Sequence, residues 1–256
     1  MIDATLADTG RTASVKAPGT GTRRSRLLGA AALAASIATI VLGLLITPPD
    51  QIQRDSVRFL YLHVPSAATT YLAFLVTAVC SIAYLVRRTR SLAWDRVAGA
   101  SAEIGLVFTA LMLITGSLWG RLTWSVYWRW DARLTSTALL FVMFLAYLAV
   151  RKLDGTTEQR AKRSAIVGII AFLDVPIVHK SVDWWQTLHQ DRTITPQDSQ
   201  LDGLMLFTLF VGLAAQILIY AWLLMHRHRL AQMEQAEEDH GLVRALDERR
   251  AEGNAR

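Results

Sequence analysis

Six long apolar runs alternate with polar, charged segments along the chain. The runs cover residues 27–47, 59–86, 97–118, 134–150, 164–178 and 204–225. A helix needs about 20 mostly apolar residues to cross a bilayer, so the first three runs and the last are long enough alone, and 134–150 reaches the lower edge of the usual range. The run 164–178 is long enough only if its helix begins near Lys162 or continues past His179. A soluble bundle of 256 residues cannot bury six such runs, so the pattern predicts an all-α, polytopic membrane protein with six transmembrane helices.

Basic residues are concentrated on one side of these six helices. Of the 27 lysines and arginines, 20 lie in the two tails and in the connections after the second and fourth runs, which share one side of the membrane. The positive-inside rule therefore predicts that both termini are cytoplasmic. Most of these basic residues flank the spans, where they can contact anionic headgroups. This accounts for the net charge of +6, so binding to nucleic acid is not expected.

The two ends of the chain differ from the middle in composition. Residues 1–26 form a basic tail that we expect to be disordered, and residues 226–256 form a charged cytoplasmic tail. The run 27–47 is too long for the apolar region of a signal peptide, so it is interpreted as a retained span. Residues 27–225 then make one membrane domain. Cys80 is the single cysteine, which excludes a disulfide framework and chemistry by a CxxC thiol pair.

Tryptophan is strongly biased toward the outer side. Six of the eight tryptophans lie in two outer loops, at Trp119, Trp124, Trp128, Trp130, Trp184 and Trp185, and Tyr127 lies among them. An aromatic belt that anchors a protein would populate both interfaces of the membrane. A dense cluster on one side favours a platform for a flat, apolar ligand.

Three histidines share this side with the tryptophans. They are His63, His179 and His189, whereas His226, His228 and His240 lie among charged residues on the cytoplasmic side. Neutral imidazoles from separate elements beside an aromatic cluster favour a haem iron. Zinc is less favoured because there is no cysteine ligand and no HxxxH pair. A cytochrome b that holds two haems is also less favoured. It would need histidine ligands at two depths of the bundle, and the candidate histidines here lie on one side only.

Three segments resemble known motifs in the same order. Residues 119–136 resemble the tryptophan-rich WWD motif of haem-handling proteins in cytochrome c biogenesis. Residues 58–65 (RFLYLHVP) and 176–190 (PIVHKSVDWWQTLHQ) resemble the flanking motifs of its CcmC branch, the haem exporter protein C family. The resemblance extends over residues 27–225 and includes the layout of six spans.

The resemblance implies a site for haem b. His63 and His189 match the axial ligands of the iron, and the expected platform consists of Trp119, Trp124, Tyr127, Trp128, Trp130 and Asp131, with Trp184 and Trp185 beside His189. Arg58 and Arg133 match basic residues that can hold the propionates through paired hydrogen bonds. Ser125, Tyr127 and Arg129 stand where the motif usually has Gly, Trp and an aliphatic residue, and Leu122 replaces a Pro.

The resemblance also implies partners and a role. The protein is expected to lie in the inner membrane and to present haem on the periplasmic side to the haem chaperone CcmE. It is expected to associate with the ABC transporter subunits CcmA and CcmB and with the small protein CcmD. The chain has no GxxxxGK[ST] phosphate loop, so ATP hydrolysis would come from a partner, and an enzymatic activity is not expected.

Two alternatives remain open at this point. One is a CcsA-type cytochrome c synthase, although that branch has more spans and further paired histidines. The other is a transporter that moves haem through its own core, for which the spans offer few polar groups beyond Glu103 and Asp174.

Overall fold

The computed structural model describes residues 21–185, 189 and 201–254, and within these ranges the chain is helical, with no strand. The helices are α1 (Arg23–Val41), α2 (Leu60–Leu85), α3 (Leu92–Trp124), α4 (Ala132–Arg151), α5 (Thr157–Phe172), α6 (Asp174–Trp184) and α7 (Gly203–Asn254). A π-helical turn, Leu42–Ile46, extends α1, and a 3-10 turn, Asp55–Phe59, precedes α2. Six stretches of these described residues are long and apolar enough to cross a membrane, which confirms the predicted all-α, six-span architecture.

The fifth span consists of two helices. α5 ends at Phe172 and α6 begins at Asp174, and together they give a span from Thr157 to Trp184. Pro176 lies in the first turn of α6, where its missing N–H costs no helical hydrogen bond. The span therefore begins before Lys162 and continues past His179, so both of the conditions that the sequence set for its length are met.

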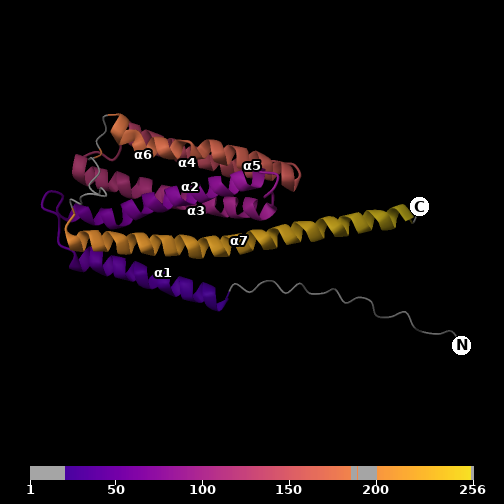
Figure 1. Ribbon diagram of the computed structural model, residues 1–256, viewed down its shortest axis with the longest axis horizontal. Helices are drawn as coiled ribbons and strands as arrows, with labels where there is room; N and C mark the ends of the chain where they lie inside the picture. Colours follow the sequence, from indigo (N-terminus) through magenta and orange to yellow (C-terminus); the bar gives the residue numbers. More distant parts are fainter. Residues whose placement is uncertain (1–20, 186–188, 190–200, 255–256) are drawn as a thin grey trace.

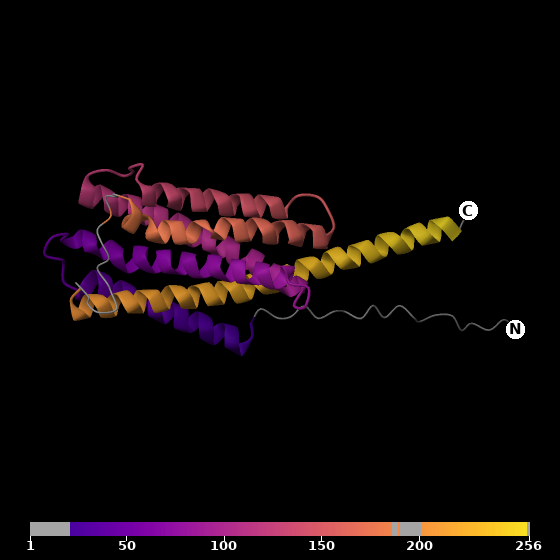
Figure 2. The same cartoon turned by 45° about the horizontal axis from the view of Figure 1, so that its top comes forward.

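The helices are arranged in layers (Figure 1). α2 and α3 pack against each other in the middle, α4, α5 and α6 cover one side, α7 packs on the other side, and α1 packs on the outside of α7. The connections 47–59 and 125–131, the end of α6 and the start of α7 lie at one end of the bundle, which we call the loop end, and the short connections 86–91 and 152–156 lie at the opposite end (Figures 1 and 2). The three segments that carry the histidine and tryptophan motifs thus meet at the loop end.

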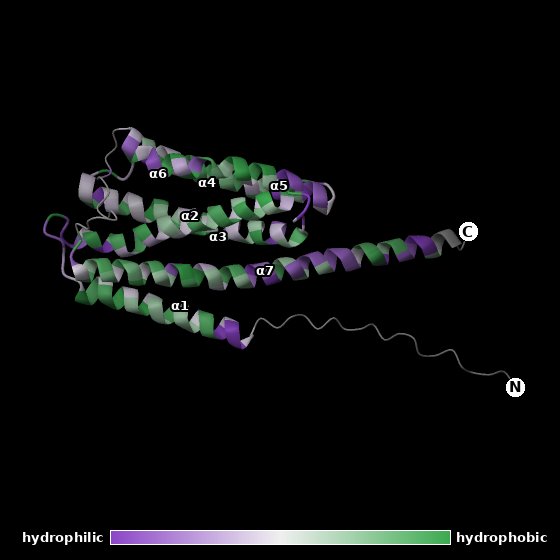
Figure 3. Ribbon diagram, in the orientation of Figure 1, coloured by the Kyte–Doolittle hydropathy of each residue, from purple (hydrophilic) through white to green (hydrophobic). Residues whose placement is uncertain are grey.

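The last helix extends far beyond the bundle. α7 is apolar along most of the bundle and charged after about residue 226, and it projects past the other helices only beyond Glu238, which still pairs with Arg160 of α5 (Figure 3). The predicted tail 226–256 is therefore a continuation of the sixth span as far as Asn254. The expected disordered tail, residues 1–26, lies outside the described residues as far as residue 20, and its last four residues already belong to α1, which begins at Arg23, so the tail is shorter than predicted.

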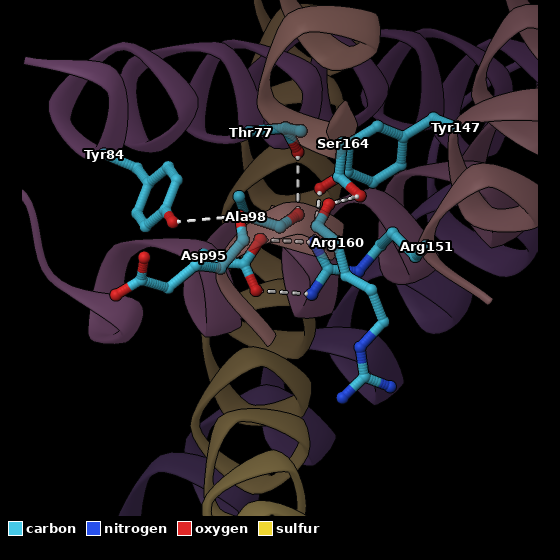
Figure 4. A network of polar contacts seen from close by, with 9 residues as sticks. Thr77, Tyr84, Asp95, Ala98, Tyr147, Arg151, Arg160 and Ser164 are labelled. Carbon is cyan, nitrogen blue, oxygen red and sulfur yellow. Dashed lines mark hydrogen bonds and ion pairs between the residues drawn. The ribbon is translucent and has the colours of Figure 1, made fainter. Parts of the chain in front are cut away.

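Two ion pairs hold the helices together at the end opposite the loops. Arg151 at the end of α4 donates to both carboxylate oxygens of Asp95 on α3, at 2.7 and 2.9 Å, and to the hydroxyl of the fully buried Tyr147 (Figure 4). Arg227 on α7 donates to both oxygens of Glu103 on α3. Glu103, a candidate from the sequence, is thus a partner in a link between α3 and α7.

A proline in α2 allows α7 to approach very closely. Pro65 has no N–H to donate to the carbonyl of Tyr61 one turn earlier. Gly212 of α7 lies against this carbonyl, and a Cβ atom at Gly212 would be 2.7 Å from the oxygen. One turn further along α7, the side-chain amide of Gln216 donates to the carbonyl of Leu62 at 3.0 Å. The missing side chain of Gly212 therefore sets the distance between α7 and α2 beside His63.

A methyl group at Gly212 should separate these two helices. We expect Gly212→Ala to lower the free energy of unfolding by about 2 kcal/mol, because the clash is with backbone and cannot be relieved by a rotamer change. Thermal unfolding in detergent measures this effect. Gly241→Ala on the same helix is the matched control, because a Cβ there meets no atom within 4 Å. If both substitutions have the same effect, Gly212 does not set the helix distance.

Candidate functional site

A pocket at the loop end collects six of the twelve candidate site residues that were singled out in the sequence. It contains about 690 Å³ of space free of protein atoms, part of it open to the outside. Its wall combines two imidazoles, four other aromatic side chains and two arginines: His63, His189, Tyr71, Trp124, Tyr127, Trp128, Arg129 and Arg133. The pocket therefore joins α2, α3, the loop after α3 and the start of α4, together with His189.

His63 lies in the first turn of α2 and is fixed by α3. Its Nδ1 is 3.1 Å from the hydroxyl oxygen of Thr115, and its ring meets the ring of Trp119 edge to face, with the centroids 5.7 Å apart. Trp119 is fixed in turn, because its indole N–H donates to the side-chain oxygen of Gln53 at 2.9 Å. The imidazole is thus held on two sides before any ligand binds.

His189 approaches the pocket from the segment after α6. Its ring lies edge to face with Trp124, with the centroids 5.0 Å apart, and its Nδ1 is 3.8 Å from a carboxylate oxygen of Asp131. Burial and the charge of Arg133 lower the pKa of His189 to about 4, although Asp131 acts in the opposite direction. A lowered pKa leaves the imidazole neutral at neutral pH, and the neutral ring is the form that coordinates a metal.

Only the middle of the tryptophan motif is a loop. α3 continues to Trp124, which is consistent with Leu122 in place of a proline that would break the helix, and α4 begins at Ala132. Ser125 ends α3 in the left-handed region, with φ of 61°, a conformation that glycine adopts without strain. Asp131 caps α4 by accepting a hydrogen bond from the backbone N–H of Leu134 at 2.8 Å. Both ends of the loop 125–131 are thus held by local backbone structure, the left-handed residue Ser125 at its start and the helix cap Asp131 at its end.

The candidate residues divide into three groups. Those that line the pocket are His63, His189, Trp124, Tyr127, Trp128 and Arg133. Those that support its wall are Trp119, Trp130 and Asp131, through their contacts with His63, Trp128 and His189 respectively. The third group lies outside the lining.

The third group contains Arg58, Trp184 and Trp185. The guanidinium of Arg58 donates to the carbonyls of Gly43 and Leu44 and pairs with Asp55, which ties α2 to the end of α1. Trp184 and Trp185 stack edge to face on each other and are each more than half exposed. Arg133 is the candidate arginine that the pocket contains, and it also donates to the carbonyl of His179 on α6 at 3.3 Å.

The pocket fits a haem better than it fits a bare metal ion. No cluster of three or more His, Cys, Asp and Glu side chains suited to a metal ion occurs in the described part of the chain. The pocket instead offers imidazoles from two separate segments, aromatic rings for an apolar macrocycle, and Arg129 and Arg133 for carboxylates. Trp128 adds a buried indole N–H that has no hydrogen-bond acceptor among the described residues. An unsatisfied donor in a pocket wall is available to a ligand.

Sequence reasoning missed several residues that shape this site. Thr115 and Gly116 hold the ring of His63, and Tyr71 lines the pocket. Thr115 could have been found from the sequence, because it lies four residues before Trp119 and therefore on the same face of α3. Tyr71 likewise lies eight residues after His63 on α2. Helical spacing from the recognised residues could have found both.

The sequence profile described as "CcmC: Heme exporter protein C" matches residues 13–242. The chain belongs to this family. Heme exporter protein C of Bradyrhizobium diazoefficiens is 37% identical over 216 residues, which cover 79% of this chain and 81% of that protein. The Haemophilus influenzae protein of the same name is 35% identical over 201 residues, 78% of this chain and 80% of its own length.

The similarity reaches beyond bacteria. A protein of Arabidopsis thaliana, named putative cytochrome c biosynthesis ccmC-like mitochondrial protein, is 36% identical over 156 residues, 61% of this chain and 58% of its own length. The resemblance inferred from three motifs is therefore confirmed as membership of the CcmC family. Together with the six apolar helices, this membership makes the chain a multi-pass membrane protein.

Proposed function

We propose that this protein binds haem b in the pocket at the loop end and presents it to the haem chaperone CcmE during the maturation of c-type cytochromes. The observation that carries the proposal is that His63 and His189, from segments far apart in the sequence, line one aromatic pocket. The names of the CcmC-family relatives, which refer to heme export and to cytochrome c biosynthesis, support the same role.

Each part of the pocket has a defined task under this proposal. His63 and His189 coordinate the iron as neutral imidazoles, and Trp124, Tyr127 and Trp128 cover the apolar macrocycle. Arg133, with Arg129 beside it, neutralises the propionates by charge-assisted hydrogen bonds. A bound haem b supplies an iron with two axial positions and a vinyl-bearing edge that a chaperone can take up.

The proposal includes an orientation and a set of partners. The loop end faces the periplasm and both tails face the cytoplasm, because 20 of the 27 basic residues lie on the side of the tails. CcmA and CcmB, as subunits of an ABC transporter, supply ATP hydrolysis, for which this chain has no phosphate loop, and CcmD completes the complex. The chain itself handles haem and is not an enzyme.

The absorption spectrum of the protein purified from haem-replete membranes tests the proposal. We expect a low-spin, six-coordinate haem spectrum with the sharp visible bands typical of two histidine ligands. A well-folded preparation that neither retains nor takes up haem would contradict it. The hand-over step is tested separately, by staining for haem bound covalently to CcmE in cells with and without this protein.

A separate experiment tests which side of the membrane the loop end faces. A reporter fused after Trp185 should be active only if the fusion site lies outside the cytoplasm. A fusion after Asn254 gives the matched control and should show the opposite result. If both fusions report the same side, the proposed presentation to a periplasmic chaperone fails even if haem is bound.

A further inference from the structure

The environment of His63 favours one of its two neutral tautomers. The hydroxyl oxygen of Thr115 is 2.7 Å from the carbonyl oxygen of Leu111 and 3.2 Å from that of Met112. Carbonyl oxygens only accept hydrogen bonds, and the contact with Leu111 is the shortest one that the hydroxyl makes, so we infer that its single proton is donated to its own helix. Toward His63, 3.1 Å away, the same oxygen can then act only as an acceptor.

This direction determines the tautomer of the imidazole. An acceptor opposite Nδ1 requires a proton on Nδ1, and a neutral imidazole carries only one N–H. The proton on Nδ1 therefore leaves the lone pair of His63 on Nε2. A free lone pair on Nε2 is what coordination of a metal through that atom requires.

The orientation of the ring is fixed by the same face of α3. A Cβ atom at Gly116 would lie 2.8 Å from Cε1 of His63, so the ring rests directly on the glycine. Trp119, one turn after Thr115, closes the side of the ring, with the centroids 5.7 Å apart. Thr115, Gly116 and Trp119 thus form a cradle that constrains both the rotation and the protonation of His63.

We propose that Thr115 is a positioning residue for haem binding: its hydroxyl holds His63 as the Nδ1–H tautomer and presents Nε2 as the ligand atom. This inference rests on the proposed function. His189 differs, because the group beside its Nδ1 is the carboxylate of Asp131 and not a hydroxyl. The two histidines are therefore prepared for coordination by partners of different charge.

Two substitutions of similar volume test the role of the hydroxyl. Thr115→Val removes the acceptor and keeps the shape, whereas Thr115→Ser keeps the acceptor. We expect Thr115→Val to lower the affinity for haem about 10-fold, the lower end of the effect of removing a partner of a ligating histidine, and Thr115→Ser to restore most of it. Thr109→Val is the matched control, because Thr109 lies on the same helix and donates to the carbonyl of Gly105 but does not line the pocket.

A second measurement does not depend on haem. Nitrogen NMR of the haem-free protein labelled at histidine should show the Nδ1–H tautomer for His63 in the wild type and a mixture of tautomers in Thr115→Val. If Thr115→Val keeps both the tautomer and the affinity, or if Val and Ser weaken binding equally, the role of the hydroxyl is refuted. If the wild type shows the tautomer but binds no haem, the proposed function fails and the assignment of the proton stands.

Discussion

His63→Ala protein should lose the low-spin, six-coordinate spectrum of the haem-loaded wild type, and its affinity for haem should fall by roughly 100-fold or more. His63 is one of two imidazoles in the pocket, and without it the iron keeps one protein ligand. This loss of affinity should exceed the 10- to 100-fold effects that are typical of removing a residue that hydrogen-bonds to a metal ligand. His189→Ala should have the same result. Absorption spectra and haem titrations of the purified variants measure both effects.

The controls use residues of the same end of the bundle. His179→Ala should leave the spectrum unchanged, because the ring of His179 packs edge to face on Tyr71 and does not line the pocket. Added imidazole should restore a six-coordinate spectrum in His63→Ala if the cavity left by the substitution is still intact. A spectrum that is indifferent to both His63→Ala and His189→Ala would refute the assignment of the axial ligands.

The largest effect on stability is expected at the opposite end of the bundle. Asp95→Ala should lower the free energy of unfolding by about 3 kcal/mol, because it leaves the guanidinium of Arg151 without its carboxylate. The side chains of Arg151 and Asp95 are only 23% and 13% exposed, so water cannot fully replace the lost partner. The ring and the hydroxyl of Tyr147 remain as partners of the guanidinium, but neither carries the negative charge that Asp95 supplied. Chemical unfolding in detergent measures the difference.

A double substitution separates the lost attraction from the unpaired charge. Asp95→Ala combined with Arg151→Met should be more stable than Asp95→Ala alone, because no buried cation remains. Asp247→Ala gives the control for an exposed pair, since Asp247 and its partner Arg250 are both largely exposed and the effect should be less than about 1 kcal/mol. Equal effects of Asp95→Ala and Asp247→Ala would show that burial does not matter here.

The membrane architecture could be predicted almost completely because apolar length is a strong constraint in a bilayer. The shortest run, 164–178, depended on residues outside itself, and the structure supplies them by beginning α5 at Thr157 and continuing α6 to Trp184. The helix break at Leu173 was not predicted, because Pro176 fits the first turn of a new helix as well as it fits the interior of a kinked one.

Motifs were enough to single out the histidines and the central tryptophans that line the candidate site, whereas the contacts among side chains could not be predicted. Arg58 and Arg133 look equivalent in the sequence, yet the guanidinium of Arg58 is bound to the carbonyls that end α1, and that of Arg133 lies in the pocket wall. Thr115 lies inside an apolar span, where hydroxyls commonly bond to their own helix. Its second contact, with His63, depends on how α2 and α3 are packed.

The length of α7 has a mechanical consequence. Gly212 presses the helix against α2 beside His63, and the same helix continues without interruption to Asn254. Between these two points α7 is tied to α3 through Arg227 and Glu103 and to α5 through Glu238 and Arg160. At about 1.5 Å per residue, the part of α7 beyond Glu238 measures roughly 24 Å. A force applied to the far end of α7 therefore acts first on these two ion pairs, which protect the contact with the carbonyl of Tyr61, and with it the backbone that carries His63, from movement of the projecting end.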